Sequence, residues 1–173
     1  MRFGVRVSGS DKVRGALAAL SERVKDLHPA LLRASIVPLT AAQGRINAQG
    51  PGWPPPAMDY GKGELLHRDG ALFRSFTVGD SANVQEDIPG GIRVGTNLRT
   101  PDGRFNIGML MQYGTGPIKP KRGKFLVFEV NGQKIFSRGT KGIPARPTLY
   151  WDDKSAKQVV GIIAAYLKNG ATA

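Results

Sequence analysis

The spacing of apolar residues divides the chain into elements of different kinds. Residues 2–7 alternate between apolar and polar side chains, which predicts a half-buried strand. After residue 12 the apolar residues instead recur at steps of four, three, four and three, a pattern typical of an amphipathic helix that ends near residue 27. We interpret this apolar stripe as facing the core of the domain rather than as a coiled-coil contact. It comprises Val13, Leu17, Leu20, Val24 and Leu27.

A second helical region follows a short interruption at His28-Pro29. A proline at the start of a helix is tolerated because its missing N–H would have no partner there. The helix is predicted to reach about residue 47, with a kink or a restart at Pro38. We interpret His28 as a capping or surface residue rather than as a ligand.

The middle of the chain predicts short elements between polar loops. A short helix over residues 64–75 is broken at Gly70. Residues 76–78 and 92–96 are predicted strands. The polar residues 79–91 would then form the loop of a long hairpin.

The last third of the chain carries the strongest local signals. Two apolar runs, residues 125–130 and 133–136, are joined by an Asn-Gly dipeptide. This dipeptide favours a tight hairpin turn because both of its residues tolerate positive φ. Residues 109–113 predict one helical turn, and residues 152–168 predict a final helix with two aspartates at its N-terminus and a lysine at its end.

These elements together predict an α+β fold. We expect one antiparallel-dominated sheet of about five strands, packed by N-terminal and C-terminal helices. Residues 1–173 are predicted to form a single domain. Two segments are expected to project from it, the loop 49–63 and the basic loop and hairpin 115–142.

Composition narrows the class of protein. With 23 glycines and 12 prolines, the chain is expected to have many turns around a modest core. No apolar run approaches the roughly 18 residues that indicate a membrane span. The first residues lack the continuous apolar segment of a signal peptide, and the chain has no cysteine. We therefore expect a cytosolic protein without disulfides.

The positive charge is concentrated in one stretch. Between residues 117 and 146 there are 8 basic residues and 1 acid, a difference of +7 out of the chain's +12. The basic charge favours a polyanionic neighbour, which is nucleic acid, an acidic protein surface or an anionic membrane, and of these we expect no membrane. The alternative is a solvated loop that only aids solubility. The candidate docking residues are Lys119, Lys121, Arg122, Lys124, Lys134, Arg138 and Lys141.

Signals for catalysis are weak. The two histidines, His28 and His67, belong to no metal-spaced cluster, and no cysteine nucleophile exists. The glycine-rich stretch before Lys124 fails as a phosphate-binding loop in its spacing, and Phe125 stands where Ser or Thr is needed. We expect a non-enzymatic protein with no cofactor and no bound metal.

A set of short motifs follows in order along the chain and ends in a C-terminal helix. The motifs are Gly52-Trp53, Leu66 with Asp69-Gly70-Ala71-Leu72 and Ser75, Val94-Gly95-Thr96, Met111-Gln112-Tyr113-Gly114 and Ile143-Pro144-Ala145-Arg146-Pro147. This ordered set resembles the virion morphogenesis, or tail completion, family of tailed bacteriophages, and the resemblance extends from about residue 10 to residue 167. Where that family often has His-Gln-Phe-Gly, this chain has Met111-Gln112-Tyr113-Gly114.

The resemblance implies a structural protein of the virion neck, assembled in the host cytoplasm. It would act as a tail terminator that caps the tail and helps in head–tail joining, as a hexameric ring around packaged DNA. Its partners would be further copies of itself, the tail tube protein and head connector proteins. The alternatives are a head-side connector adaptor and a free-standing basic nucleic-acid-binding module.

Three residues are candidates for subunit contacts. Trp53 lies in a proline-rich loop and either packs locally or inserts into a neighbour. Tyr113 belongs to the Met-Gln-Tyr-Gly motif. Arg146 either reaches a neighbouring subunit or bonds a carbonyl at the turn before the last helix, and we favour the carbonyl.

Overall fold

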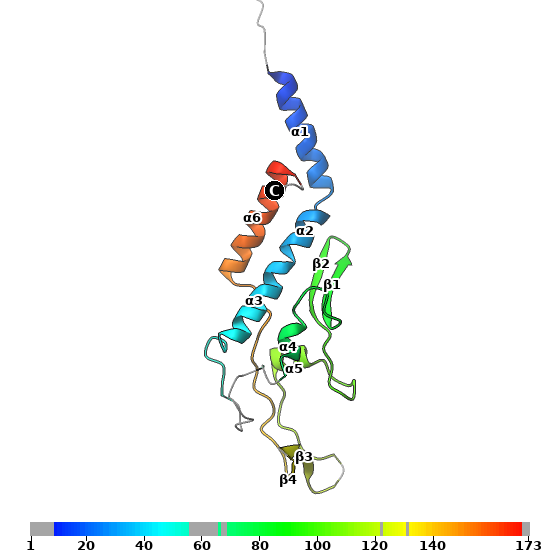
Figure 1. The fold of residues 1–173 in the computed structure, drawn as a ribbon, viewed down its shortest axis with the longest axis vertical. Helices are drawn as coiled ribbons and strands as arrows, with labels where there is room; N and C mark the ends of the chain where they lie inside the picture. The colour runs from blue at the N-terminus through cyan, green and yellow to red at the C-terminus, as the bar shows by residue number, and fades with distance from the viewer. Residues whose placement is uncertain (1–8, 56–65, 67–68, 122, 131, 171–173) are drawn as a thin grey trace, which may run out of the picture.

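The computed structural model describes residues 9–55, 66, 69–121, 123–130 and 132–170. They form an elongated molecule with a helix extending from one end and a hairpin at the other (Figure 1). The elements in chain order are α1 (Ser10–Lys25), α2 (His28–Ala34), α3 (Ile36–Asn47), α4 (Ala71–Arg74), β1 (Asn83–Ile88), β2 (Gly91–Thr96), α5 (Ile107–Tyr113), β3 (Leu126–Val130), β4 (Gln133–Ser137) and α6 (Asp153–Asn169).

The body is built on α2 and α3, which follow one another almost in line. Helix α6 lies along one side of them, and the β1–β2 hairpin packs on another (Figure 1). The two helices are separated at Ser35, whose hydroxyl donates to the Leu32 carbonyl at 2.6 Å. Pro38 occupies the first turn of α3, where a missing N–H removes no helical hydrogen bond. The predicted restart is confirmed, and it lies just ahead of the proline.

The α+β class is confirmed, but the predicted five-stranded sheet is wrong. The described residues contain two separate antiparallel sheets of two strands each, β1–β2 and β3–β4. The predicted strand at residues 2–7 lies outside the described residues. A two-stranded sheet is only marginally stable by itself, so the body depends on its helices to form a core.

The β1–β2 hairpin differs from the predicted one. Its strands pair from Asn83 opposite Thr96 to Ile88 opposite Gly91, so β1 lies inside the polar stretch expected to be a loop. Residues 76–78, predicted as a strand, instead form turns after α4. The physical reason is that the amides of Phe76 and Thr77 donate to the carbonyls of Phe73 and Arg74, at 3.2 and 2.7 Å, and in these turns the Phe76 ring is buried in the core.

The hydrophobic core is small and lies between α3, α4 and the turn after α4. Several half-buried residues pack against it, among them Trp53, Met111 and Leu149. Met111 and Leu149 flank the segment that carries the β3–β4 hairpin, so this segment begins and ends beside the core. The fully buried members are Leu39, Ala42, Ile46, Leu72 and Phe76.

Helix α1 does not face the core, contrary to the prediction. None of its residues is buried, and Val13 and Leu17 are each 60% exposed. The helix extends beyond the end of the body and contacts α6 (Figure 1). Arg23 Nη1 donates to the carbonyls of Leu167 and Lys168 at 2.8 Å, so α1 is attached at its C-terminal end and leaves its apolar stripe in solvent.

The accessible surface is large for a chain of this mass. The molecule exposes 12807 Å², whereas a compact monomer of the same mass exposes about 8,200 Å². The excess is larger than the roughly 3,900 Å² that the residues outside the described ranges would expose as fully unfolded chain. The described part is therefore itself extended. Among the described helices, none is both long and apolar enough to cross a membrane.

Candidate interaction surface: the basic arm

The basic arm, residues 115–142, leaves the body after α5 and returns before α6 (Figure 1). Its two legs run side by side in opposite directions. The Thr115 amide donates to the Ile143 carbonyl at 2.8 Å. Further out, Ile118 and Thr140 exchange both main-chain hydrogen bonds, at 3.1 and 2.9 Å. The legs are thus joined to each other along the chain before the hairpin begins.

The β3–β4 hairpin forms the end of the arm. Its pairing runs from Leu126 opposite Ser137 to Val130 opposite Gln133, which confirms the hairpin predicted from the Asn-Gly dipeptide. Gly132 has φ 78, as such a turn requires. Asn131 lies outside the described residues.

Two glycines allow the legs to approach closely at their base. Gly114 has φ 69, and a Cβ added there would lie 2.5 Å from the Ile143 carbonyl oxygen. Gly142 has φ 90, and a Cβ there would overlap the Thr115 carbonyl oxygen. Any other residue would both strain the backbone and push the legs apart.

The arm is fixed to the body by Gln112 and by the main chain beside it. The Gln112 Oε1 accepts hydrogen bonds from the amides of Thr148 and Leu149 at 3.0 and 3.1 Å. The Arg146 amide donates to the Met111 carbonyl at 2.6 Å. The Met-Gln-Tyr-Gly and Ile-Pro-Ala-Arg-Pro segments, far apart in sequence, are therefore bonded to each other at the root of the arm.

Arg146 is buried at this root. Its Nε and Nη2 donate to the Pro54 carbonyl at 3.2 and 2.9 Å, and Nη2 also donates to the Pro55 carbonyl at 3.2 Å. Burial lowers the pKa of the guanidinium. The interpretation of Arg146 as a carbonyl-bonding residue is confirmed. A contact with a neighbouring subunit stays a prediction.

The cations of the arm point into solvent. Six of them are described, and none forms an ion pair with any acidic side chain that the structure describes, which leaves out the side chain of Glu129 on β3. Arg122, the seventh candidate, lies outside the described ranges. The exposed set comprises Lys119, Lys121, Lys124, Lys134, Arg138 and Lys141.

One face of the hairpin adds apolar surface to this charge. Val127 and Phe136 lie opposite each other across the two strands and are 58% and 63% exposed. Lys134 lies on the same face of β4, because it precedes Phe136 by two residues and side chains alternate along a strand. A lone two-stranded hairpin is marginally stable in water, so a surface of this kind gains from a covering partner.

The two aromatic contact candidates differ in exposure. Trp53 packs against the core, and its ring lies on Gly50, which has no side chain to obstruct it. The predicted local packing is therefore confirmed, although the buried indole Nε1 has no hydrogen-bond partner among the described residues. Tyr113 is 71% exposed at the end of α5, so its ring is available for a contact.

Arg45 is a buried charge that the sequence motifs did not indicate. Its guanidinium bonds Asp152, donates to the Thr148 carbonyl at 2.9 Å and lies 3.7 Å from the centre of the Tyr150 ring. Asp152 also caps α6 by accepting from the Ser155 amide at 2.7 Å. The Ser155 bonds, together with Arg45, lower the pKa of Asp152 to about 2. The sequence signal that could have indicated this buried charge is the position of Arg45 among apolar residues of the second predicted helix.

The arm therefore combines exposed cations, exposed apolar side chains and a rigid root. This combination suits contact with a polyanion or with an acidic protein surface. In the part of the chain that the structure describes, no group of three or more histidine, aspartate or glutamate side chains is placed to hold a metal. No protein-family model, curated protein or solved structure matches this chain.

Proposed function

We propose that this chain is a structural protein of a bacteriophage virion, a tail completion protein that acts as tail terminator at the neck. Copies of it would form a hexameric ring around the DNA channel and help join the tail to the head. The observation that supports this function best is the basic arm, which is rooted in the body by main-chain and Gln112 hydrogen bonds.

The arm suits a ring because it would repeat its charge around a central opening. Cations without fixed acidic partners attract phosphates by charge alone and read no base sequence. That is the contact which passing DNA of any sequence requires. The exposed pair Val127 and Phe136 would meanwhile suit a protein neighbour at the tail tube or the connector.

Subunits in a ring meet through two different surfaces, one on each side of the chain. An extended molecule with projections at both ends offers such unlike surfaces (Figure 1). The same reasoning applies to a head-side connector adaptor, which also forms rings. The tail-side function is proposed because the ordered motifs resemble the tail completion family, and two of those motifs bond to each other at the arm root.

Two measurements test the ring together. The mass in solution is measured by light scattering over a wide range of protein concentration, and binding to double-stranded DNA is measured at several salt concentrations. A mass that increases with protein concentration and reaches that of a hexamer supports the ring. A mass that stays monomeric, combined with tight and salt-sensitive DNA binding by that monomer, contradicts the ring and favours the free-standing nucleic-acid-binding module.

A further inference from the structure

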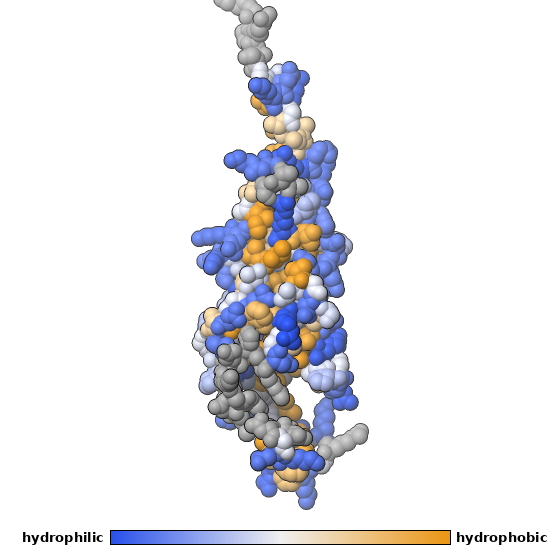
Figure 2. Space-filling view, viewed as in Figure 1, coloured by the Kyte–Doolittle hydropathy of each residue, from blue (hydrophilic) through white to orange (hydrophobic). Residues whose placement is uncertain are grey.

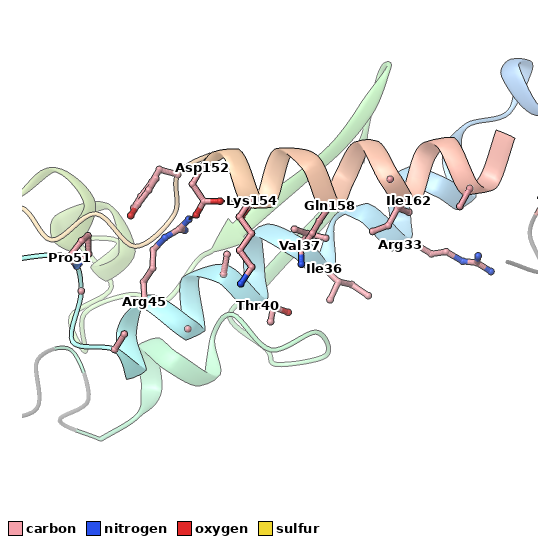
Figure 3. Close-up of a pocket in the computed structure, with 18 of the residues that line it drawn as sticks. Arg33, Ile36, Val37, Thr40, Arg45, Pro51, Asp152, Lys154, Gln158 and Ile162 are labelled. Carbon is pink, nitrogen blue, oxygen red and sulfur yellow. Dashed lines mark hydrogen bonds and ion pairs between the residues drawn. The ribbon is translucent and has the colours of Figure 1, made fainter. Parts of the chain in front are cut away.

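A groove of about 1230 Å³ runs along the body between α3 and α6 (Figure 3). One wall carries Ile36, Val37 and Thr40, and the other carries Gln158 and Ile162. Figure 2 shows hydrophobic residues gathered on the face where α6 lies beside α2 and α3. Small residues contribute to the lining, so another backbone can approach closely. They are Ala41, Gly44, Gly161 and Ala165.

Helix α1 carries the complementary surface. Leu20 and Val24 are 39% and 53% exposed, and they continue the stripe begun by Val13 and Leu17. The two acids of the helix, Asp11 and Glu22, fall on the opposite side by helical spacing. Among the described residues, none buries the apolar face of this amphipathic helix, while α3 and α6 form a groove suited to such a helix.

The α1 helix cannot occupy its own groove in this arrangement. The Tyr166 hydroxyl donates to the Asp26 carbonyl at 2.8 Å, just beyond the end of α1. Together with the bonds from Arg23 to the end of α6, it holds α1 pointing away from the body. Folding back would break these bonds, whereas a second copy can supply the same helix without breaking them.

We propose that α1 of one copy lies in the α3–α6 groove of the next copy. The inference rests on the ring proposed above, and it names the contact between neighbouring subunits. The contact is head-to-tail, since the helix and the groove are different surfaces of the same chain. Every copy then gives one helix and receives another, and such a head-to-tail contact forms a ring when the rotation between neighbouring copies closes.

The size of the surfaces favours an assembly over an isolated pair. The groove is lined by 19 residues, whereas a stable interface takes about 20–30 residues from each side. One helix in one groove therefore lies at the weak end of the range. In a closed ring each copy makes the contact twice, and the large exposed surface of the single chain is reduced accordingly.

Engineered disulfides test the contact directly, because the natural chain has no cysteine. Chains carrying Leu17→Cys are mixed with chains carrying Lys154→Cys, Gln158→Cys or Ile162→Cys, which sample successive turns along the groove. After mild oxidation we expect a covalent dimer in at least one mixture. The matched control is Ala18→Cys on the opposite side of α1, which should give none.

The same variants distinguish the competing arrangements. A disulfide dimer of Leu17→Cys chains alone would mean that α1 pairs with α1, and it would overturn the proposal. A disulfide within one chain, in the double variant Leu17→Cys with Gln158→Cys, would mean that α1 fills its own groove. That result would overturn the proposal too.

A second measurement separates this contact from the ring itself. We expect Leu17→Glu to reduce the mass of the assembly to that of the single chain, while Ala18→Glu, with the same added charge, leaves it unchanged. If Leu17→Glu keeps the wild-type mass and no mixture cross-links, the contact is refuted while the ring stands. If the wild-type chain is itself monomeric at every concentration and no mixture cross-links, both proposals fail.

Discussion

The side-chain amide of Gln112 bonds both main-chain groups of Leu149. Its Nε2 donates to the Leu149 carbonyl at 3.0 Å, and its Oε1 accepts from the Leu149 amide at 3.1 Å. One side chain thereby supplies the pairing that a neighbouring strand would give. These two hydrogen bonds fix to α5 the segment that follows the arm, so the arm's position depends on them.

Replacing Gln112 with Ala should destabilise the fold. The substitution leaves the Leu149 carbonyl and the amides of Thr148 and Leu149 without these partners, and we expect a loss of roughly 2–4 kcal/mol of unfolding free energy. Urea unfolding measures it. The control is Tyr113→Ala, the next residue, whose exposed side chain should matter by less than about 0.5 kcal/mol. Equal losses of unfolding free energy in the two variants would contradict the stabilising role of the Gln112 hydrogen bonds.

The stability of the protein should fall in acid because of Asp152. Its pKa is lowered from 3.8 to about 2 by the Ser155 hydrogen bonds and Arg45. A lowered pKa in the folded state contributes stability above pH 4 that is lost as the pH falls toward 2. Unfolding midpoints measured in steps across this window should therefore decline with falling pH.

Asp152→Asn is the variant that isolates this charge. Asparagine still caps a helix but carries no carboxylate for Arg45, so the variant should be less stable at pH 7 and should lose less on going from pH 4 to pH 2. The control Asp153→Asn, on the adjacent exposed residue, should keep the wild-type slope. An unchanged slope in Asp152→Asn would refute the assignment.

A side chain added at the base of the arm, where the two legs approach closely, should disrupt the arm. Gly114→Ala combines a positive φ with a clash against the Ile143 carbonyl, and we expect a cost of at least about 2 kcal/mol. Gly116→Ala is the matched control, because a Cβ there meets nothing within 4 Å. Thermal unfolding and trypsin cleavage within the lysine-rich arm report the difference. Identical behaviour of the two variants would show that the close approach is unimportant.

Removing the charge of the basic loop should impair assembly and leave the fold intact. In the variant Lys119, Lys121, Arg122 and Lys124 are replaced together with Ser. We expect few joined particles, and the log–log slope of DNA affinity against salt should become shallower by about 0.9 for each DNA phosphate that the variant no longer neutralises. Circular dichroism checks the fold.

The control for this variant changes the net charge equally elsewhere on the protein. Arg93, Arg104, Lys157 and Lys168 are exposed and distributed over the body. Their joint replacement with Ser should preserve particle yield. A wild-type yield of joined particles from the basic-loop variant would refute the role assigned to that loop.

Elements with strong local signals could be predicted from the sequence. The final helix has an N-cap aspartate in Asp152 and an apolar face, and it forms with nearly the expected bounds, Asp153–Asn169. The β3–β4 hairpin follows from its Asn-Gly turn. In both cases neighbouring residues determine the geometry, so the chain remote from them adds little.

Elements that depend on remote contacts could not be predicted. Strand β1 is polar because its far end, from Glu86 to Ile88, is exposed on a two-stranded sheet. The stripe of α1 indicates which face is apolar but not what covers it. Arg45 and Gln112 are single polar residues whose partners lie far along the chain, so no spacing identified them as structural centres.

The two legs of the basic arm also determine how it would respond to mechanical force. Hydrogen bonds between antiparallel segments lie across the segments. A pull along the arm that draws one leg past the other loads the bonds at Thr115 and at Ile118 and Thr140 simultaneously, in shear. A force that separates the legs at the tip would instead open these bonds one after another. The arm is therefore built to resist sliding along its length more strongly than it resists splaying.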